Sequence, residues 1–265
     1  MVKKYEKLTL SNEFVFGKVT ENEELCQKLL ETLLQTDIES LQQLMREKEI
    51  RFKWGTKPVR RDIYVKDKKD VLYDAEMQNK NGKTLEYLAL PKRSRYYQSV
   101  MDSEILKKGV HYSRLNDSYI IFICTFDPFG LGQYVYTFRN ICEENTSLQL
   151  GDKATKIFFN TKSKQENIPE NIKNLFAYIE TGKVSDDLTQ KLEEEILQLR
   201  NDEKWWGEYM KSVTWEMDAR YEGHQEGVLD TLIALVKDGI IDITEAAKRA
   251  NISEDEFMTM IENCN

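Results

Sequence analysis

The first part of the chain places hydrophobic residues with the period of an amphipathic helix. They occupy one side of residues 12–34, at Phe16, Val19, Leu25, Leu29, Leu30, Leu33 and Leu34. This spacing predicts helical structure over that range. Asn12 or Ser11 is the expected cap of its first turn, and Thr20 followed by Glu23 has the pattern of a capping box.

Two strands are predicted next, at about residues 58–66 and 71–78. They are rich in β-branched and aromatic residues, and the connection "KDKKD" is short enough for a hairpin. Residues 37–49, ahead of them, are polar and charged, which indicates a short helix or a loop. The later segment "LPKRSRYYQSVMDSEILKKG" has Pro near its start and Gly at its end, and this punctuation predicts a helix.

Three further apolar runs predict strands: "SYIIFICTF", "QYVYTFRNIC" and "TKIFFNT". The first is continuously apolar, as in a strand buried on both faces. After residue 166 the pattern is helical to the end of the chain. The order of elements predicts an α/β fold with a mixed sheet flanked by helices and an α-helical C-terminal extension. We expect a core at residues 1–165, a helical extension at 166–220 and a small unit at 221–265.

The small C-terminal unit has the rhythm of a helix-turn-helix. "ITEAAKRANIS" predicts a helix and a turn, and "SEDEFMTMI" predicts a second helix capped by Ser. A DNA-reading helix is expected to be basic or rich in amides near its start, whereas this one begins with Glu254, Asp255 and Glu256. We therefore interpret the unit as one for packing or self-association, a homodimer through the C-terminal helices, rather than one that reads DNA.

Composition excludes several classes of protein. The chain has 265 residues, 40% hydrophobic and 32% charged, which is typical of a globular protein. No apolar run approaches the roughly 20 residues of a membrane span, and the N-terminus lacks the apolar region of a signal peptide. Four scattered cysteines favour free thiols in a reducing cytoplasm, where we expect the protein. His111 and His224 lack ligand spacing, and no glycine-rich nucleotide motif occurs.

Charge is distributed unevenly. The net charge is -8, yet residues 46–69, called here the basic segment, hold ten Lys or Arg and four acids. Residues 180–265 hold nine basic residues and twenty-one acids. A local positive segment of this kind suits contacts with phosphates, and an ordinary solvated surface is the alternative.

Acids occupy the predicted hairpin, although acids are poor strand formers. Side chains alternate along a strand, so Asp74 and Glu76 share one face of the second strand with Gln78. In the obvious hairpin pairing, Asp62 of the first strand converges with Glu76. Paired carboxylates repel unless a cation lies between them, and their hard oxygens suit Mg²⁺ or Mn²⁺. The alternative is a polar outer face of an antiparallel hairpin.

The stretch "RRDIYVKDKKDVLYDAEMQ" resembles the signature of the PD-(D/E)XK nuclease superfamily. It is most similar to the Rpn family of recombination-promoting nucleases, the PD-(D/E)XK nuclease family transposases. "LSNEFVFGKV", "LPKRSRYYQSVMD", "YIIFICTFDPFG" and "LGDKATKIFFNTK" also resemble segments of that family in the expected order. The resemblance covers roughly residues 8–165 and implies a PD-(D/E)XK core.

The resemblance assigns roles to particular residues. Glu13, Asp62 and Glu76 match the metal-binding acids, so it implies one or two Mg²⁺ or Mn²⁺ ions. Gln78 stands where the superfamily pattern has lysine, and a neutral amide orients water only by hydrogen bonds. Lys80 is an alternative source of that charge. Catalysis would then rest on Asp62, Glu76 and Gln78.

The same resemblance and the basic segment indicate where DNA is bound. The expected contacts are Lys53, Lys57, Arg60, Arg61, Arg93 and Tyr97. Alternation directs Arg61 to the strand face opposite Asp62, which suggests phosphate or structural contacts. Arg93 and Tyr97 lie four apart on one helix face, and Arg93 is placed to reach a phosphate or a motif carboxylate.

The sequence thus predicts a Mg²⁺-dependent DNA endonuclease. The resemblance implies products with a 5′-phosphate and a 3′-hydroxyl, and a role in recombination, mobile elements or phage defence. The alternative is a catalytically inactive DNA-binding or assembly protein that retains the fold.

Overall fold

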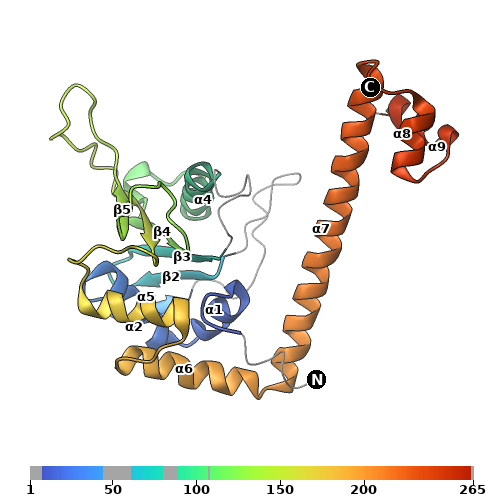
Figure 1. Cartoon of the computed structure of the whole chain (residues 1–265). Coiled ribbons are helices and arrows are strands. Elements are labelled where there is room, and N and C mark those ends of the chain that lie inside the picture. Colours follow the sequence, from blue (N-terminus) through green and yellow to red (C-terminus); the bar gives the residue numbers. More distant parts are fainter. Residues whose placement is uncertain (1–7, 44–60, 80–88, 107, 264–265) are drawn as a thin grey trace. The chain divides into compact units, whose positions relative to one another are not determined.

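A computed structural model describes residues 8–43, 61–79, 89–106 and 108–263. The chain divides into two compact units, Met1–Asn201 and Asp202–Asn265, and the first contains the sheet (Figure 1). In the described residues the sheet has six strands: β1 (Leu41–Gln43), β2 (Ile63–Asp67), β3 (Leu72–Gln78), β4 (Ser118–Cys124), β5 (Val135–Phe138) and β6 (Ala154–Asn160).

The predicted mixed sheet is confirmed. The strand order is β1-β2-β3-β4-β6-β5. β3, β4 and β6 run parallel, and antiparallel strands complete both edges. β4 lies in the middle and its residues 120–124 are fully buried, as its continuous apolar run predicted.

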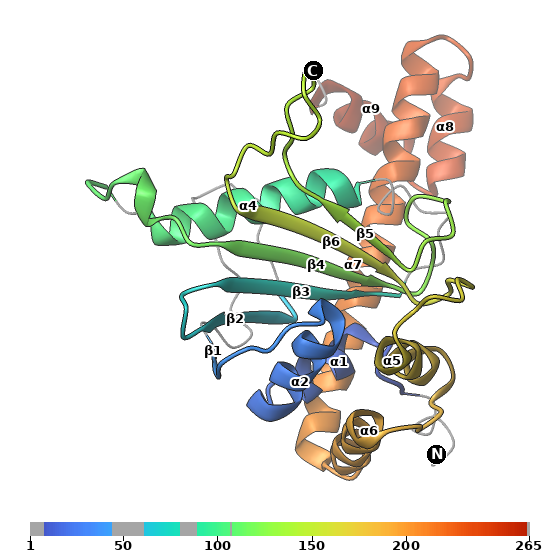
Figure 2. The ribbon, with the colours of Figure 1, turned by 90° about the vertical axis from the view of Figure 1, so that its left-hand side faces the viewer.

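Helices cover both faces of this sheet (Figure 2). α4 (Leu90–Ile105) packs on one face, where Tyr97, Val100 and Met101 join Ile120 and Phe122 of β4 in one hydrophobic cluster. The helices α1 (Glu13–Val19), α2 (Glu23–Leu34) and α5 (Glu170–Thr181) cover the other face. α6 (Asp187–Arg200) packs against α1, α2 and α5, so α5 and α6 belong to the first unit rather than to a separate extension.

Two expectations near the N-terminus were wrong: the capping box at Thr20 and Glu23, and the helix or loop expected to include residues 41–43. Residues 12–34 form two helices, and the second is capped by Asn22, whose side chain accepts from the N–H groups of Glu24 and Leu25. Thr20 ends α1 instead, because its hydroxyl donates to the carbonyl of Phe16 at 2.8 Å. Residues 41–43, expected in a short helix or a loop, form the edge strand β1 through pairing with β2.

The predicted β2–β3 hairpin is confirmed, and Asp67 fixes its turn. Asp67 Oδ1 accepts from the N–H groups of Lys69 and Val71, at 2.9 and 2.8 Å. Asp67 Oδ2 accepts from the hydroxyl of Tyr73 at 3.0 Å. These bonds hold the pairing of the two strands that carry the candidate site.

The second unit contains α7 (Glu203–Lys237), α8 (Ile243–Ala250) and α9 (Glu254–Asn263). Its core gathers Leu232 and Ile233 of α7, Ala246 and Ala247 of α8, and Phe257 of α9. The predicted Ser cap of the last helix is present, since Ser253 Oγ accepts from the N–H of Glu256 at 3.3 Å. Among the described residues, no helix combines the length and apolar character that crossing a bilayer requires.

Candidate active site

The hairpin pairing brings the two motif acids together. Tyr64 of β2 lies opposite Asp74 of β3, and continuing the pairing by two residues places Asp62 opposite Glu76. The backbone N–H of Asp62 donates to Glu76 Oε1 at 3.4 Å, and the N–H of Met77 donates to Asp62 Oδ2 at 3.0 Å. The Asp62 carboxylate is thereby tied to the strand that carries Glu76.

β3 presents a row of three polar side chains to α4. Asp74, Glu76 and Gln78 are 0%, 3% and 8% exposed. Buried polar groups are costly unless they are hydrogen-bonded, and buried charges are costly unless they are paired. This row therefore needs partners from the elements that cover it.

Arg93 of α4 supplies partners for two members of the row. Its Nη2 donates to Glu76 Oε2 at 2.7 Å, and its Nη1 donates to Gln78 Oε1 at 3.0 Å. Its Nε donates to the hydroxyl of Tyr97 at 2.9 Å, which confirms that Arg93 and Tyr97 share a helix face. Of its two expected targets, a phosphate or a motif carboxylate, the structure shows the carboxylate.

Asp62, Asp74, Glu76 and Arg93 form a cluster in which the charge of each residue affects the pKa of its neighbours. Burial raises the pKa of Glu76 well above its usual value, and the charges of Asp62 and Asp74 raise it further, whereas Arg93 lowers it. Burial lowers the pKa of Arg93, but the charge of Glu76 and smaller effects, including that of Glu13, raise it overall. Arg93 is therefore protonated and stabilises the charged form of Glu76.

Glu13 begins α1 and is exposed. Asn12 caps this helix, as one of the two expected candidates, by accepting from the N–H groups of Phe14 and Val15 at 3.1 Å each. α1 packs against the candidate site at Gly17, where a Cβ atom would lie 3.8 Å from the Cα of Asp62.

Arg61 points to the sheet face that α4 covers, where it meets Asp74 of β3 and Glu104 of α4. Its Nε is 2.9 Å from Asp74 Oδ2, its Nη1 is 3.2 Å from Glu104 Oε2, and its guanidinium lies over the Tyr64 ring at 4.0 Å. Residue 61 precedes β2, so strand alternation does not direct it. Its side chain is 3% exposed, and the contact observed is the structural one.

Glu104 was absent from the predicted site residues. It lies eleven positions after Arg93 on α4, about three helical turns, which places both on one face. That spacing was a usable signal. The pKa of Asp74 is raised to about 7, because burial raises it, Arg61 and Arg93 lower it, and the nearby charge of Glu104 raises it further.

The structure does not describe the remaining residues that were expected to contact DNA or to supply a charge. Lys53, Lys57, Arg60 and the alternative Lys80 lie outside the described residues. Over the described ranges, no group of three or more His, Cys, Asp or Glu side chains is assembled closely enough to hold a metal ion. Glu13 thus does not join Asp62 and Glu76 in a ready three-ligand cluster.

The pair itself has the chemistry of a cation site. Asp62 and Glu76 offer hard oxygen donors, which suit Mg²⁺ or Mn²⁺. Burial and the charges of Asp62 and Asp74 raise the pKa of Glu76, whereas Arg93, whose Nη2 lies 2.7 Å from Glu76 Oε2, lowers it, so nearby positive charge favours the ionised form of Glu76. The donor set therefore fits a divalent cation.

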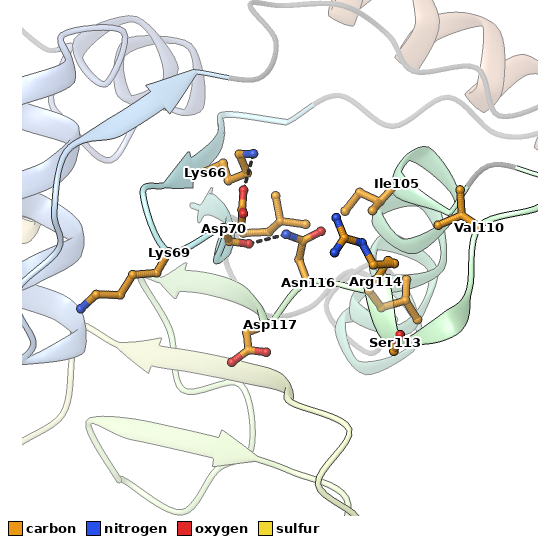
Figure 3. Close-up of a pocket in the computed structure, with 11 residues that line it drawn as sticks. Lys66, Lys69, Asp70, Ile105, Val110, Ser113, Arg114, Asn116 and Asp117 are labelled. Atoms are coloured by element: carbon orange, nitrogen blue, oxygen red, sulfur yellow. Dashed lines mark hydrogen bonds and ion pairs between the residues drawn. The ribbon is translucent and has the colours of Figure 1, made fainter.

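A separate hollow of about 560 Å³ lies at the other end of the hairpin (Figure 3). Lys66 donates to Asp70 Oδ1 at 2.6 Å there, and Asn116 donates to the carbonyl of Asp70. Ile105, Arg114 and other residues complete its lining, none of them a predicted site residue. The paired acids are thus distinct from this hollow.

The comparisons with known proteins point to one family. A family model described as "PD-(D/E)XK nuclease family transposase" matches residues 13–222. The match spans the chain from Glu13 through the hairpin and α4 into α7. No curated protein and no solved structure matched.

Proposed function

The chain belongs to the PD-(D/E)XK nuclease family transposases, and we propose that it is a divalent-metal-dependent endonuclease that hydrolyses phosphodiester bonds of DNA. The observation that carries this proposal is the pairing of Asp62 and Glu76 across the hairpin. Acidic side chains buried in a sheet cost stability unless they have partners. A cation held between the buried Glu76 and the half-buried Asp62 would supply a partner for both.

Asp62 and Glu76 would hold the ion, and Glu13 would approach from α1. Support for Glu13 comes from the packing of α1 on Asp62 at Gly17 and from the influence of Glu13 on Arg93. A bound Mg²⁺ or Mn²⁺ supplies a Lewis acid for phosphate charge and makes water more acidic.

Gln78 would hold the attacking water. Its Oε1 accepts from Arg93 and its Nε2 donates to the carbonyl of Met77 at 2.9 Å. An amide nitrogen has two N–H groups, so one remains to orient a water for in-line attack. The expected products carry a 5′-phosphate and a 3′-hydroxyl.

DNA would approach over the basic segment. The chain has a net charge of -8, so only a local positive surface can attract phosphates. Lys53, Lys57 and Arg60 are the proposed contacts. Hydrolysis does not require recognition of specific DNA ends, whereas strand transfer by a transposase would.

A plasmid-nicking assay tests the proposal. The wild type should nick supercoiled DNA with Mg²⁺ or Mn²⁺ and stop when EDTA is added. Asp62→Asn and Glu76→Gln should each reduce the rate by at least about a hundredfold, since loss of outer partners of a metal ligand alone costs about 10- to 100-fold.

Asp70→Asn is the matched control. It makes the same chemical change on the same hairpin, at an exposed residue whose partner is Lys66. This variant should nick DNA like the wild type. If the wild type binds DNA but nicks none under any metal condition, the chain is the non-catalytic DNA-binding alternative.

A further inference from the structure

We propose that Arg93 is a catalytic residue that supplies the positive charge facing the reacting phosphate. This inference rests on the proposed nuclease function and assigns within it a role that residue 78 is unable to fill. Phosphoryl transfer gathers negative charge on phosphate oxygens, and a fixed cation at that place stabilises the transition state. Gln78 is neutral, so the charge must come from another element.

Arg93 lies one hydrogen bond from the end of the Gln78 side chain. Its Nη1 donates to Gln78 Oε1 at 3.0 Å while its Nη2 donates to Glu76 Oε2 at 2.7 Å. The guanidinium thus bridges the two side chains that end the catalytic strand. A charge delivered from α4 reaches the place that a longer cationic side chain at residue 78 would reach.

The guanidinium is held in one orientation. Nε donates to the Tyr97 hydroxyl at 2.9 Å, and the Tyr97 and Phe122 rings lie 5.1 and 5.6 Å from the guanidinium carbon. Both distances are in the range of cation–π contacts. A donor fixed before the reaction needs no reorganisation when charge develops.

Arg93 also retains donors for a ligand. A guanidinium has five N–H groups, and the bonds to Tyr97, Gln78 and Glu76 engage three of them. Its side chain is 35% exposed and thus not sealed from solvent, and we infer that the remaining N–H groups contact a phosphate oxygen of bound DNA. Arginine presents such donors in a planar fork that matches phosphate geometry.

The other arginine of this cluster is sealed. Arg61 is 3% exposed and is held by Asp74 and Glu104. It therefore balances buried acids and does not reach a bound DNA strand. Lys80 lies outside the described residues and is the rival source of charge, so the test includes it.

Cleavage under single-turnover conditions separates these roles. Arg93→Gln should lower the maximal rate by about 10²- to 10³-fold, the effect of removing one such donor, while DNA affinity in EDTA changes only a few-fold. Arg93→Lys should retain part of the rate. Adding Gln78→Lys to Arg93→Gln should restore at least tenfold, because it returns a cation to the same place.

Two controls and a fold measurement accompany these variants. Arg95→Gln removes the same charge from an exposed position of the same helix and should leave the rate unchanged, as should Lys80→Gln. Thermal unfolding establishes that Arg93→Gln is folded, and the rescue by Gln78→Lys excludes a general loss of structure.

Three results would overturn the inference: an Arg93→Gln rate equal to that of the wild type, a loss confined to DNA affinity, or a rate loss carried by Lys80→Gln. A measurement that does not depend on cleavage tests the role of Arg93 separately from the proposed nuclease function. In EDTA, the side-chain Nε–H resonance of Arg93 should shift on addition of a short DNA duplex, and that of Arg95 should not. If the wild type nicks no DNA but the Arg93 signal shifts, the nuclease proposal fails and the phosphate contact stands; an unchanged signal removes the contact as well.

Discussion

Glu76 is subject to opposing influences on its charge. Burial and the charges of Asp62 and Asp74 raise its pKa, whereas Arg93 lowers it. A carboxyl group in this position is stabilised by taking up either a proton or a cation. The stability of the folded chain should therefore depend on pH through Glu76, with or without DNA.

In metal-free buffer we expect Glu76 to make the free energy of unfolding fall as pH rises. Its folded pKa lies above its unfolded value, so its contribution is fully present below the unfolded pKa and is lost as pH rises through the folded pKa. In Glu76→Gln this titration is absent. Urea unfolding in EDTA between about pH 5 and pH 8 should show a shallower fall for the variant.

Asp70→Asn is again the control, because the pKa of Asp70 is shifted in the opposite direction to that of Glu76. Lys66 lowers the pKa of Asp70, so any contribution of Asp70 is present above its unfolded pKa and is lost as pH falls. This variant should keep the wild-type fall between about pH 5 and pH 8. Identical slopes for the wild type and Glu76→Gln would contradict the raised pKa.

The approach of Asp62 to Glu76 could be predicted from sequence, because the short hairpin connection fixes which backbone positions of the two segments lie opposite one another. The partnership of Arg61 with Asp74 could not. Arg61 precedes its strand, where no period fixes the direction of a side chain. Its position depends on Glu104, which arrives from α4 and is distant in sequence.

α1 is the element that approaches the paired acids from the other side of the sheet. It has seven residues, and Gly17 meets the backbone of Asp62. A Cβ atom on Gly17 would lie 3.8 Å from the Cα and carbonyl oxygen of Asp62 and 3.9 Å from its Cβ. These are ordinary contact distances, so the helix has room for one methyl group and little more.

Gly17→Ala should therefore be tolerated and should stabilise the protein by up to about 1 kcal/mol, through the higher helix propensity of alanine. Gly17→Leu should displace Asp62 and reduce DNA nicking. Urea unfolding and the nicking assay measure the two effects. Gly207→Leu is the control, because Gly207 is also helical and has nothing within 4 Å of its Cβ position; nicking by Gly17→Leu at the wild-type rate would show that α1 does not position Asp62.

The existence of the long elements followed from sequence, as did the caps at Asn12 and Ser253, whereas the end of α1 and the strand β1 did not. Helical periodicity continues past residue 20, and the break there depends on Thr20 bonding back to Phe16 and on Asn22 capping α2. β1 has three residues and gains its structure from pairing with β2. Such a strand carries no periodic pattern long enough to recognise.

The two units of the molecule have separate cores. The second is built from α7, α8 and α9 around Phe257, which is fully buried. The sequence placed boundaries at residues 165 and 220, whereas the structure divides after Asn201. An amphipathic pattern identifies α5 and α6 as helices but does not say which surface their apolar faces cover.

Phe257→Ala should destabilise the second unit alone, by about 3–5 kcal/mol. Hydrogen exchange followed by mass spectrometry should show faster exchange in α8 and α9 and unchanged exchange in β4. Met258→Ala, at an exposed neighbouring position, should change neither. Faster exchange in β4 of Phe257→Ala would mean that the two cores unfold together.

The path of the chain through β3, α4 and β4 has a consequence for folding kinetics. The β2–β3 hairpin is local and can form within about 1–10 μs, so Asp62 and Glu76 meet while water still screens their repulsion. Parallel pairing of β3 with β4 must wait for closure of the connection that contains α4. Because α4 carries Arg93, the ion-pair partner of the buried Glu76, we expect dehydration and neutralisation of Glu76 to occur in one step, so that the folding chain avoids an intermediate with an unpaired buried carboxylate.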